Sequence, residues 1–288
     1  MMLVVLSAAL SCAGCTMPEP IRVMSFNIRY GTADDGDNRW ELRRQLVFQT
    51  IRAYDPDIIG FQEVLGSQAR ELCDALPDYE FVGVGRDDGW KRGEFAPIMF
   101  RRKLFKAVDC GYLWLSERPD RPGVKGWDAA CPRMLTWVRL GFKRRPLNSV
   151  YVVNTHFDHV GKRARLESAE IVRRMVESLG GKPIIVTGDF NCPPGSAPYE
   201  ILTEDRLNLA ELRDTYALVG EVEDGQATFH GFGGLRLGKR IDWILFNRRL
   251  EVFEAAIDRR EFGGRYPSDH FPVTATLRLK PATDSGAM

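Results

Sequence analysis

The stretch Pro183-Ile184-Ile185-Val186-Thr187-Gly188-Asp189-Phe190-Asn191 is the most informative part of the chain about its fold. Its first five residues are nearly all apolar, which is typical of a short strand buried on both faces of a sheet. The run then ends in a carboxylate and an amide, which are costly to bury without polar partners. We therefore expect a central strand whose end exposes polar side chains at the edge of a sheet.

Apolar runs on both sides of this stretch predict further strands with helices between them. The predicted strands cover residues 21–30, 58–63, 81–85, 97–101, 105–115, 135–142, 149–155, 183–187, 240–246, 250–257 and 273–279. A helix is predicted over 39–54, where Val47, Ile51 and Tyr54 share one face and Asn38 is the expected N-cap. A second helix is predicted over 163–179. This order indicates two packed sheets with helices outside, in a single domain.

Composition indicates a soluble globular protein. The chain has 288 residues, of which 44% are apolar and 27% are charged. With 40 Lys+Arg against 39 Asp+Glu, it has no general field that would attract a polyanion, so composition does not indicate a nucleic-acid binder. Short basic clusters at 101–103, 143–145 and 162–163 are typical of solvated turns or helix faces. No apolar run between residues 18 and 280 is long enough to cross a bilayer.

The N-terminal residues differ from the rest of the chain. The apolar run Leu3–Leu10 has the size of an export signal and is followed by small residues. Cys12-Ala13-Gly14-Cys15 resembles a bacterial lipobox in which Cys15 would be lipidated. We expect a lipoprotein-like signal peptide over 1–15, a tether over 16–20, one domain over 21–280 and a tail over 281–288. The protein would then be exported, either as a membrane-anchored lipoprotein or as a periplasmic or extracellular protein. An ordinary N-terminal strand or a misplaced start codon is the alternative.

The remaining four cysteines, Cys73, Cys110, Cys131 and Cys192, lack metal-binding spacing. They are expected to be mostly buried free thiols. In an exported protein a Cys110–Cys131 bridge is the alternative.

Polar residues recur where the predicted strands end or begin. Such residues are exposed together along one edge of a sheet, which is a common location for catalytic sites. They are Asn27, Glu63, Glu94, His156, Asp158, Asp189 and Asn191. Asp242 differs because it lies within Ile241-Asp242-Trp243, where a carboxylate needs a buried partner such as His270.

Several short motifs, taken in order, resemble the endonuclease/exonuclease/phosphatase superfamily. They are Ser25-Phe26-Asn27, Gln62-Glu63-Val64, Asn154-Thr155-His156, Gly188-Asp189-Phe190-Asn191, Arg240-Ile241-Asp242 and Ser268-Asp269-His270. The resemblance covers about residues 21–279. It implies a DNase I-like four-layer α/β sandwich, with two mixed β-sheets packed face to face and helices outside. It also implies a monomeric hydrolase that cleaves a phosphate ester with Mg²⁺, for which Mn²⁺ could substitute.

The same resemblance implies roles for individual residues. Glu63 would be the main metal ligand, with Asn27 and Asp269 near the ion. Asp189 would orient or deprotonate the attacking water, and Asn191 would hold the phosphate or that water. Two imidazoles would stabilise charge on the phosphorane: His270, braced by Asp242, and His156, braced by Glu94. A cation, imidazolium donors and a carboxylate base are suited to in-line attack on phosphorus.

Other motifs resemble a bacterial branch of this superfamily with unassigned substrates. They are Gly111–Ser116, Gly126–Arg133, Asp158-His159 and Thr228–Phe232. The candidate substrate-binding residues are Arg29, Tyr112, Arg133, Asp158 and His230. No long insertion resembles a DNA-intercalating arm, which argues against DNA repair.

The expected function is phosphate ester hydrolysis, with a phosphodiester favoured over a phosphomonoester. A phospholipid head group, a sugar phosphate or a nucleic acid could be the substrate. The main alternative is an extracellular or periplasmic endonuclease acting on DNA or RNA. An alternative of another class is a lipid-anchored, non-catalytic binding module. The complete set of acids and histidines argues against a module, because a site without chemistry is expected to lose at least one of them.

Overall fold

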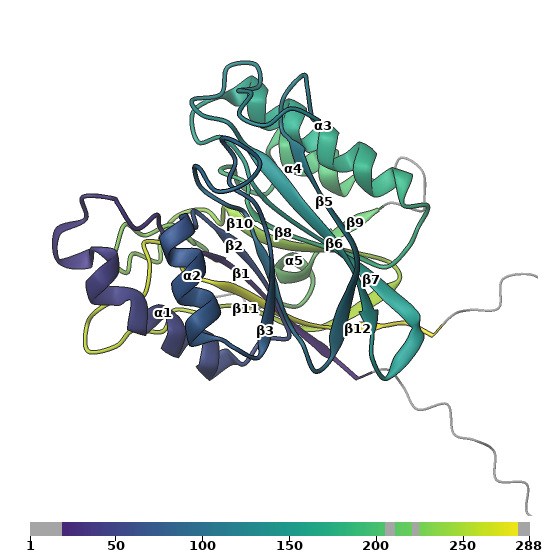
Figure 1. Cartoon of the computed structure of the whole chain (residues 1–288), viewed down its shortest axis with the longest axis horizontal. Helices are drawn as coiled ribbons and strands as arrows, with labels where there is room; N and C mark the ends of the chain where they lie inside the picture. The colour runs from purple at the N-terminus through teal and green to yellow at the C-terminus, as the bar shows by residue number, and fades with distance from the viewer. Residues whose placement is uncertain (1–18, 205–210, 221–224, 282–288) are drawn as a thin grey trace, which may run out of the picture.

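Twelve strands form two six-stranded sheets in the computed structural model, which describes residues 19–204, 211–220 and 225–281 (Figure 1). The first sheet has the strand order β11 (Leu250–Ile257), β12 (Val273–Leu279), β1 (Ile21–Asn27), β2 (Ile58–Gln62), β4 (Ile98–Arg101) and β3 (Tyr79–Val82). The second has the order β5 (Phe105–Trp114), β6 (Met134–Phe142), β7 (Arg145–His156), β8 (Ile184–Asp189), β10 (Asp242–Asn247) and β9 (Leu212–Asp214).

Both sheets are mixed, and each has one parallel pair of strands. β1 runs parallel to β2, and β7 runs parallel to β8, whereas the other paired strands are antiparallel. In the second sheet, the last residue of β7, His156, is opposite Asp189, and the first residue of β10, Asp242, is also opposite Asp189. The strand pairing therefore brings polar residues from three separate segments of the chain together.

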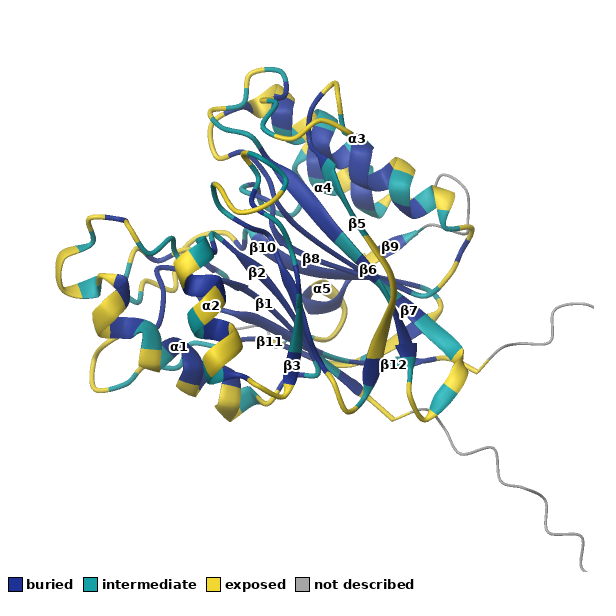
Figure 2. Ribbon diagram, viewed as in Figure 1, coloured by how far each residue is buried: buried dark blue, intermediate teal, exposed yellow. Residues whose placement is uncertain are grey.

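Helices cover the outer faces of the two sheets. α1 (Trp40–Tyr54) and α2 (Gly66–Ala75) pack on the first sheet, and α3 (Lys162–Ser178) and α4 (Ala197–Thr203) pack on the second. The short α5 (Thr215–Val219) lies against β10 and β11. One apolar cluster lies between the sheets and one under each outer helical layer, and Figure 2 shows the central strands buried along most of their length. The predicted four-layer sandwich is confirmed.

A buried polar network crosses between the sheets next to the strand ends. Gln62 Nε2 donates to Asn154 Oδ1 at 2.7 Å, and Thr187 Oγ1 donates to the same oxygen at 2.9 Å. Gly60 makes this approach possible, because a Cβ at that position would lie 2.0 Å from Thr187 Oγ1. The network fixes the position of one sheet relative to the other directly beneath the polar strand ends.

Several predicted boundaries differ from the structure. β1 ends at Asn27 rather than at residue 30, because Arg29 adopts a left-handed backbone with φ of 55° that cannot continue a strand. Asn38 is not the N-cap of α1; it ends a 3₁₀ turn, Gly36–Asn38, and Arg39 occupies the cap position without a side-chain bond. The elements α2, α4, β9 and α5 were not predicted.

The cysteine predictions are partly wrong. Cys73, Cys110, Cys131 and Cys192 are all free, so the alternative Cys110–Cys131 bridge does not form. Only Cys192 is buried, whereas Cys73 and Cys110 are exposed. Within the described residues, no helix is long and apolar enough to cross a membrane. The predicted signal peptide, most of the tether and nearly all of the tail lie outside the described residues.

Candidate active site

The candidate site lies at the end of the sandwich where β1, β2, β7 and β8 end. Asn27 and His156 are the last residues of their strands, and Glu63 directly follows β2. Asp269 and His270 lie in the segment that leads into β12. Most of these side chains are buried, although all are polar or charged. They must therefore satisfy one another or a ligand.

Asn27 joins two acids of the site. Its Nδ2 donates to Glu63 Oε1 at 3.1 Å and to Asp189 Oδ2 at 3.0 Å. Glu63 Oε2 accepts a second hydrogen bond, from the backbone N–H of Tyr30 at 3.1 Å. Glu63 has a φ of 61°, a conformation that is uncommon for a residue with a side chain. The strand end thus holds the Glu63 carboxylate in one orientation.

Asp189 is the centre of the site. Its Oδ1 accepts from the backbone N–H of Asn191 at 3.0 Å. Its Oδ2 lies 3.5 Å from His156 Nε2 and 3.8 Å from His270 Nε2, so the carboxylate stands between the two imidazoles. Burial and the nearby Asp242 raise the pKa of Asp189 to about 7, although His270 and Asn27 oppose this. A carboxylate with a pKa near neutrality is suited to accept a proton.

Asp242 pairs with His270, as its burial led us to expect. His270 Nδ1 donates to Asp242 Oδ2 at 2.9 Å, and both side chains are buried. Burial disfavours a charged imidazole, but the Asp242 carboxylate outweighs it and raises the pKa of His270 well above the ordinary value. Asp242 Oδ1 is buried and has no hydrogen-bond partner among the described residues. His270 is therefore held as an imidazolium directed at Asp189.

His156 has the opposite charge state. Burial lowers its pKa well below the ordinary value, and the nearby Arg133 and Arg86 lower it further. The expectation of two imidazolium donors is therefore wrong for His156, which is neutral at neutral pH. One charged and one neutral imidazole flank Asp189.

The expected bracing of His156 by Glu94 is replaced by a different contact. Both oxygens of Glu94 accept from Arg86, each at 2.8 Å, in a bidentate ion pair. Glu94, Arg86, Arg133 and His156 line one small cavity of about 10 Å³, roughly the volume that one water molecule needs. Glu94 therefore shares this cavity with His156, but its charge is neutralised by an arginine.

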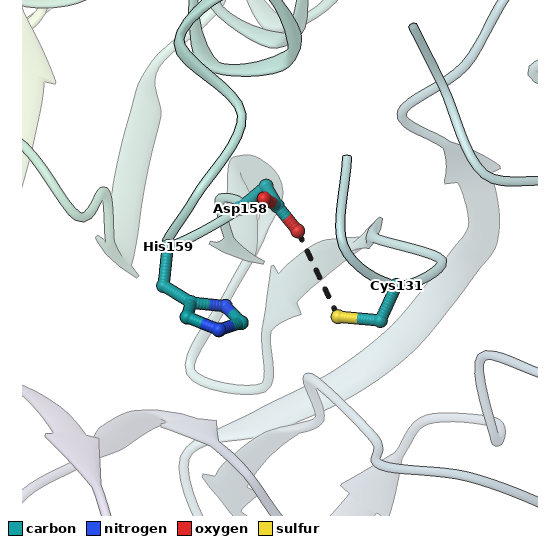
Figure 3. A group of neighbouring side chains, drawn as sticks. All are labelled: Cys131, Asp158 and His159. Carbon is teal, nitrogen blue, oxygen red and sulfur yellow. Dashed lines mark hydrogen bonds between the residues drawn. The ribbon is translucent and has the colours of Figure 1, made fainter. Parts of the chain in front are cut away.

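Cys131, Asp158 and His159 form a cluster next to His156 (Figure 3). Arg133 occupies it: Nη2 donates to His159 Nδ1 at 3.0 Å, and Nε donates to Asp158 Oδ2 at 3.5 Å. A cation here would be repelled by the guanidinium, so the cluster does not fit a metal. Asp158 is fully buried and its oxygens also accept three backbone N–H groups, which differs from the expected substrate contact. It braces the loop after β7 instead.

The other candidate substrate residues lie at different distances from the acids. Arg29 is closest, with its Nε 3.7 Å from Asp269 Oδ2 and its guanidinium paired with Asp35 at 3.0 Å. His230 is buried and stacks on Phe271 with ring centroids 3.8 Å apart. Tyr112 packs against the apolar cluster between the sheets. Their contacts with substrate stay predictions.

Arg43 was missed by the sequence reasoning. It is fully buried and donates to the backbone carbonyls of Ile28, Arg29 and Pro267 at 2.7–3.0 Å. It thereby ties the loop after β1 to the segment that carries Asp269. Its spacing contained the signal: Arg43 lies four residues before Val47, on the buried face of α1, where a charge must have a specific partner.

The acids of the site fit a divalent cation. Burial and the negative charge of Glu63 raise the pKa of Asp269, although His270 and Arg29 oppose this effect. Ligand atoms of Asp189, Asp242 and His270 also lie within 4.8 Å of one another. Carboxylate and amide oxygens are hard ligands, and a cation among them would relieve the mutual repulsion of the acids.

The sandwich and this constellation of acids and imidazoles define a metal-dependent phosphoric ester hydrolase. The sequence pattern of the Endonuclease/Exonuclease/phosphatase family matches residues 24–270, and the chain belongs to this family. The fold and family expected from the short motifs are thereby confirmed.

Three relatives place the chain within the family. An endonuclease/exonuclease/phosphatase from Bacteroides vulgatus has 38% identity and a TM-score of 0.83, covering 91% of this chain and 100% of its own. A mannosyl-6-phosphatase from Bacteroides thetaiotaomicron has 33% identity and a TM-score of 0.82, covering 90% of this chain and 100% of its own. Human nocturnin is 23% identical over 92% of this chain and 67% of its own length.

Proposed function

We propose that this chain is a magnesium-dependent hydrolase that cleaves a phosphate ester by in-line attack of water. The observation that carries the proposal is the position of Asp189. Its Oδ2 accepts from Asn27 at 3.0 Å and lies 3.5 and 3.8 Å from the two imidazoles. A buried carboxylate between a neutral and a charged imidazole is suited to proton transfer next to a group that becomes negatively charged.

The roles of the residues follow from their charges and positions. Magnesium, held by Glu63 with Asn27 and Asp269, would supply positive charge that offsets the charge on the phosphoryl oxygens. Asp189 accepts a proton from the attacking water, which Asn191 helps to position. His270 contributes its charge to the phosphorane oxygens, because Asp242 keeps it protonated. His156, which is neutral, contributes a hydrogen bond.

The substrate class has two candidates. A phosphodiester is the expectation from the sequence, and the bridging ester could belong to a lipid head group, a glycan or a nucleic acid. A phosphomonoester on a sugar is the second candidate. It is favoured by the Bacteroides thetaiotaomicron relative, which is named a mannosyl-6-phosphatase and is 33% identical over its whole length. The near-zero net charge of this chain does not favour nucleic acid.

One assay tests the chemistry and separates the candidates. Hydrolysis rates would be measured on bis(p-nitrophenyl) phosphate, p-nitrophenyl phosphate, mannose 6-phosphate, DNA and RNA, each with magnesium, manganese or EDTA. We expect hydrolysis that EDTA abolishes, that Asp189→Asn removes, and that the exposed-site control Asp109→Asn retains. Hydrolysis that persists in EDTA or in Asp189→Asn would refute the proposal. Substrate binding without turnover would indicate a non-catalytic binding module.

A further inference from the structure

The end of the sandwich opposite the active site is where the described chain begins and ends. β1 starts there at Ile21, and its antiparallel partner β12 ends there at Leu279. Figure 1 shows the β6–β7 turn beside both ends of the described chain. Backbone bonds join the turns of this end, from Lys143 N–H to the Leu104 carbonyl and from Lys280 N–H to the Arg249 carbonyl, each at 2.9 Å. We call this surface the basal face.

The basal face carries excess positive charge, although the whole chain has a net charge of only +1. Its exposed basic residues are Arg102, Lys103, Lys143, Arg144, Arg249 and Lys280. Several of the acids at this end are already paired. Asp55 and Asp57 both pair with Arg101, and Glu19 pairs with Arg144 at 3.2 Å. The two basic clusters that the sequence placed in separate turns, at 101–103 and 143–145, meet on this one surface.

Apolar groups lie among these charges. Leu147, close to the β6–β7 turn, is 100% exposed. Beside it is a groove of about 400 Å³ whose apolar wall is formed by Ile21, Leu104, Phe105, Phe142 and Leu279. Arg144 and Arg145 also line the groove. An exposed leucine and an apolar groove with basic residues at its rim combine the two features that favour binding at a lipid–water interface.

We infer that the basal face docks on an anionic phospholipid surface. Its basic turns would contact the phosphate groups, and Leu147 would enter the interface. The covalent chain supports this occupant, because residues 16–20, the predicted tether after a lipidated Cys15, span at most about 18 Å. Charge complementarity favours an anionic surface over a neutral one.

This docking would orient the active site. The six residue steps from Ile21 to Asn27 along β1 correspond to about 20 Å. The acids and imidazoles therefore lie at the far end of the molecule from the lipid. In this orientation the enzyme acts on soluble or extended substrates rather than on head groups of the membrane to which it is bound.

Vesicle sedimentation tests the inference on the full chain with Cys15→Ser, which prevents lipidation. We expect binding to phosphatidylcholine vesicles that contain phosphatidylglycerol, and much weaker binding to phosphatidylcholine alone. The triple variant Lys103→Gln/Lys143→Gln/Arg144→Gln should bind the anionic vesicles about 100-fold more weakly, or about fivefold per charge. The control Lys125→Gln/Lys162→Gln/Arg174→Gln removes the same charge from exposed positions elsewhere and should bind like the parent. Leu147→Ser should weaken binding several-fold at high salt, where charge is screened.

Three results would overturn the inference. The first is equal binding by the basal triple variant and the control, which would show that total charge, not this face, matters. The second is equal binding to neutral and anionic vesicles. The third is a dimer in light scattering that Leu147→Ser converts to a monomer without vesicle binding, which would show that a second copy covers the groove. Thermal unfolding of each variant verifies that it is folded.

Discussion

Replacing Asp158 by asparagine should destabilise the protein by an amount that depends on pH. The carboxylate is fully buried, and it accepts backbone N–H groups of Gly161 at 2.7 Å, Val160 at 3.0 Å and Ala130 at 3.1 Å. Burial opposes its ionisation, but these bonds and Arg133 outweigh burial and lower its pKa from 3.8 to about 2. That difference corresponds to about 2.4 kcal/mol of folding free energy at neutral pH.

The sign of the pH dependence follows from the lowered pKa. The ionised carboxylate contributes its full stabilisation above the unfolded-state value of 3.8, and this is lost as pH falls towards about 2. At pH 3, roughly half of it, or about 1 kcal/mol, is already lost. Asparagine does not titrate in this range. The difference in unfolding free energy between the native protein and Asp158→Asn should therefore narrow by about 1 kcal/mol between pH 7 and pH 3.

Urea unfolding at pH 7, 5 and 3 measures this difference directly. Asp109→Asn serves as the control, because Asp109 is an exposed aspartate on β5 that is far less constrained. A gap between the native protein and Asp158→Asn that stays constant from pH 7 to pH 3 would refute the reasoning. In that case the loop after β7 would be stabilised by packing rather than by the ionised carboxylate.

Three further predictions concern the site and the N-terminus. Glu63→Gln should lower metal-dependent activity more than about 100-fold without loss of stability, because it removes a ligand charge and keeps the shape; magnesium titration of an unaltered, fully active variant would contradict the assignment. Asp242→Asn and His270→Ala should each cost most of what the double variant costs, because the two residues act as a unit; activity losses that simply multiply would show independent sites. Intact-mass measurement on the native membrane fraction should find a lipidated chain that begins at Cys15, whereas a soluble species that begins at Met1 or Met2 would contradict the lipobox interpretation.

The sheets were predictable because their strands carry strong local patterns. β8 is apolar along its length, and the predicted bounds of β11 and β12 match the structure. The pairing of Asp242 with His270 was also predictable, since a carboxylate between Ile241 and Trp243 requires a partner. In each case one residue or one run was sufficient, because burial alone decided the outcome.

Other features depend on contacts that no local pattern contains. α4 has seven residues and β9 has three, which is too short for a period to appear. The ion pair of Glu94 with Arg86 arises from a turn that brings residues eight positions apart together. The neutral state of His156 depends on burial together with charges from two distant loops. These are products of tertiary structure.

The left-handed backbone at Glu63 has a consequence for how this protein can evolve. Its φ of 61° costs a residue with a side chain about 1–2 kcal/mol relative to glycine. Arg29 and Asn191, at the ends of neighbouring strands, have φ values of 55° and 51°. The active-site end therefore carries strain that the rest of the sandwich must offset. Selection for thermal stability alone would favour Glu63→Gly and remove a ligand, so in this enzyme stability and activity are in direct opposition at one backbone position.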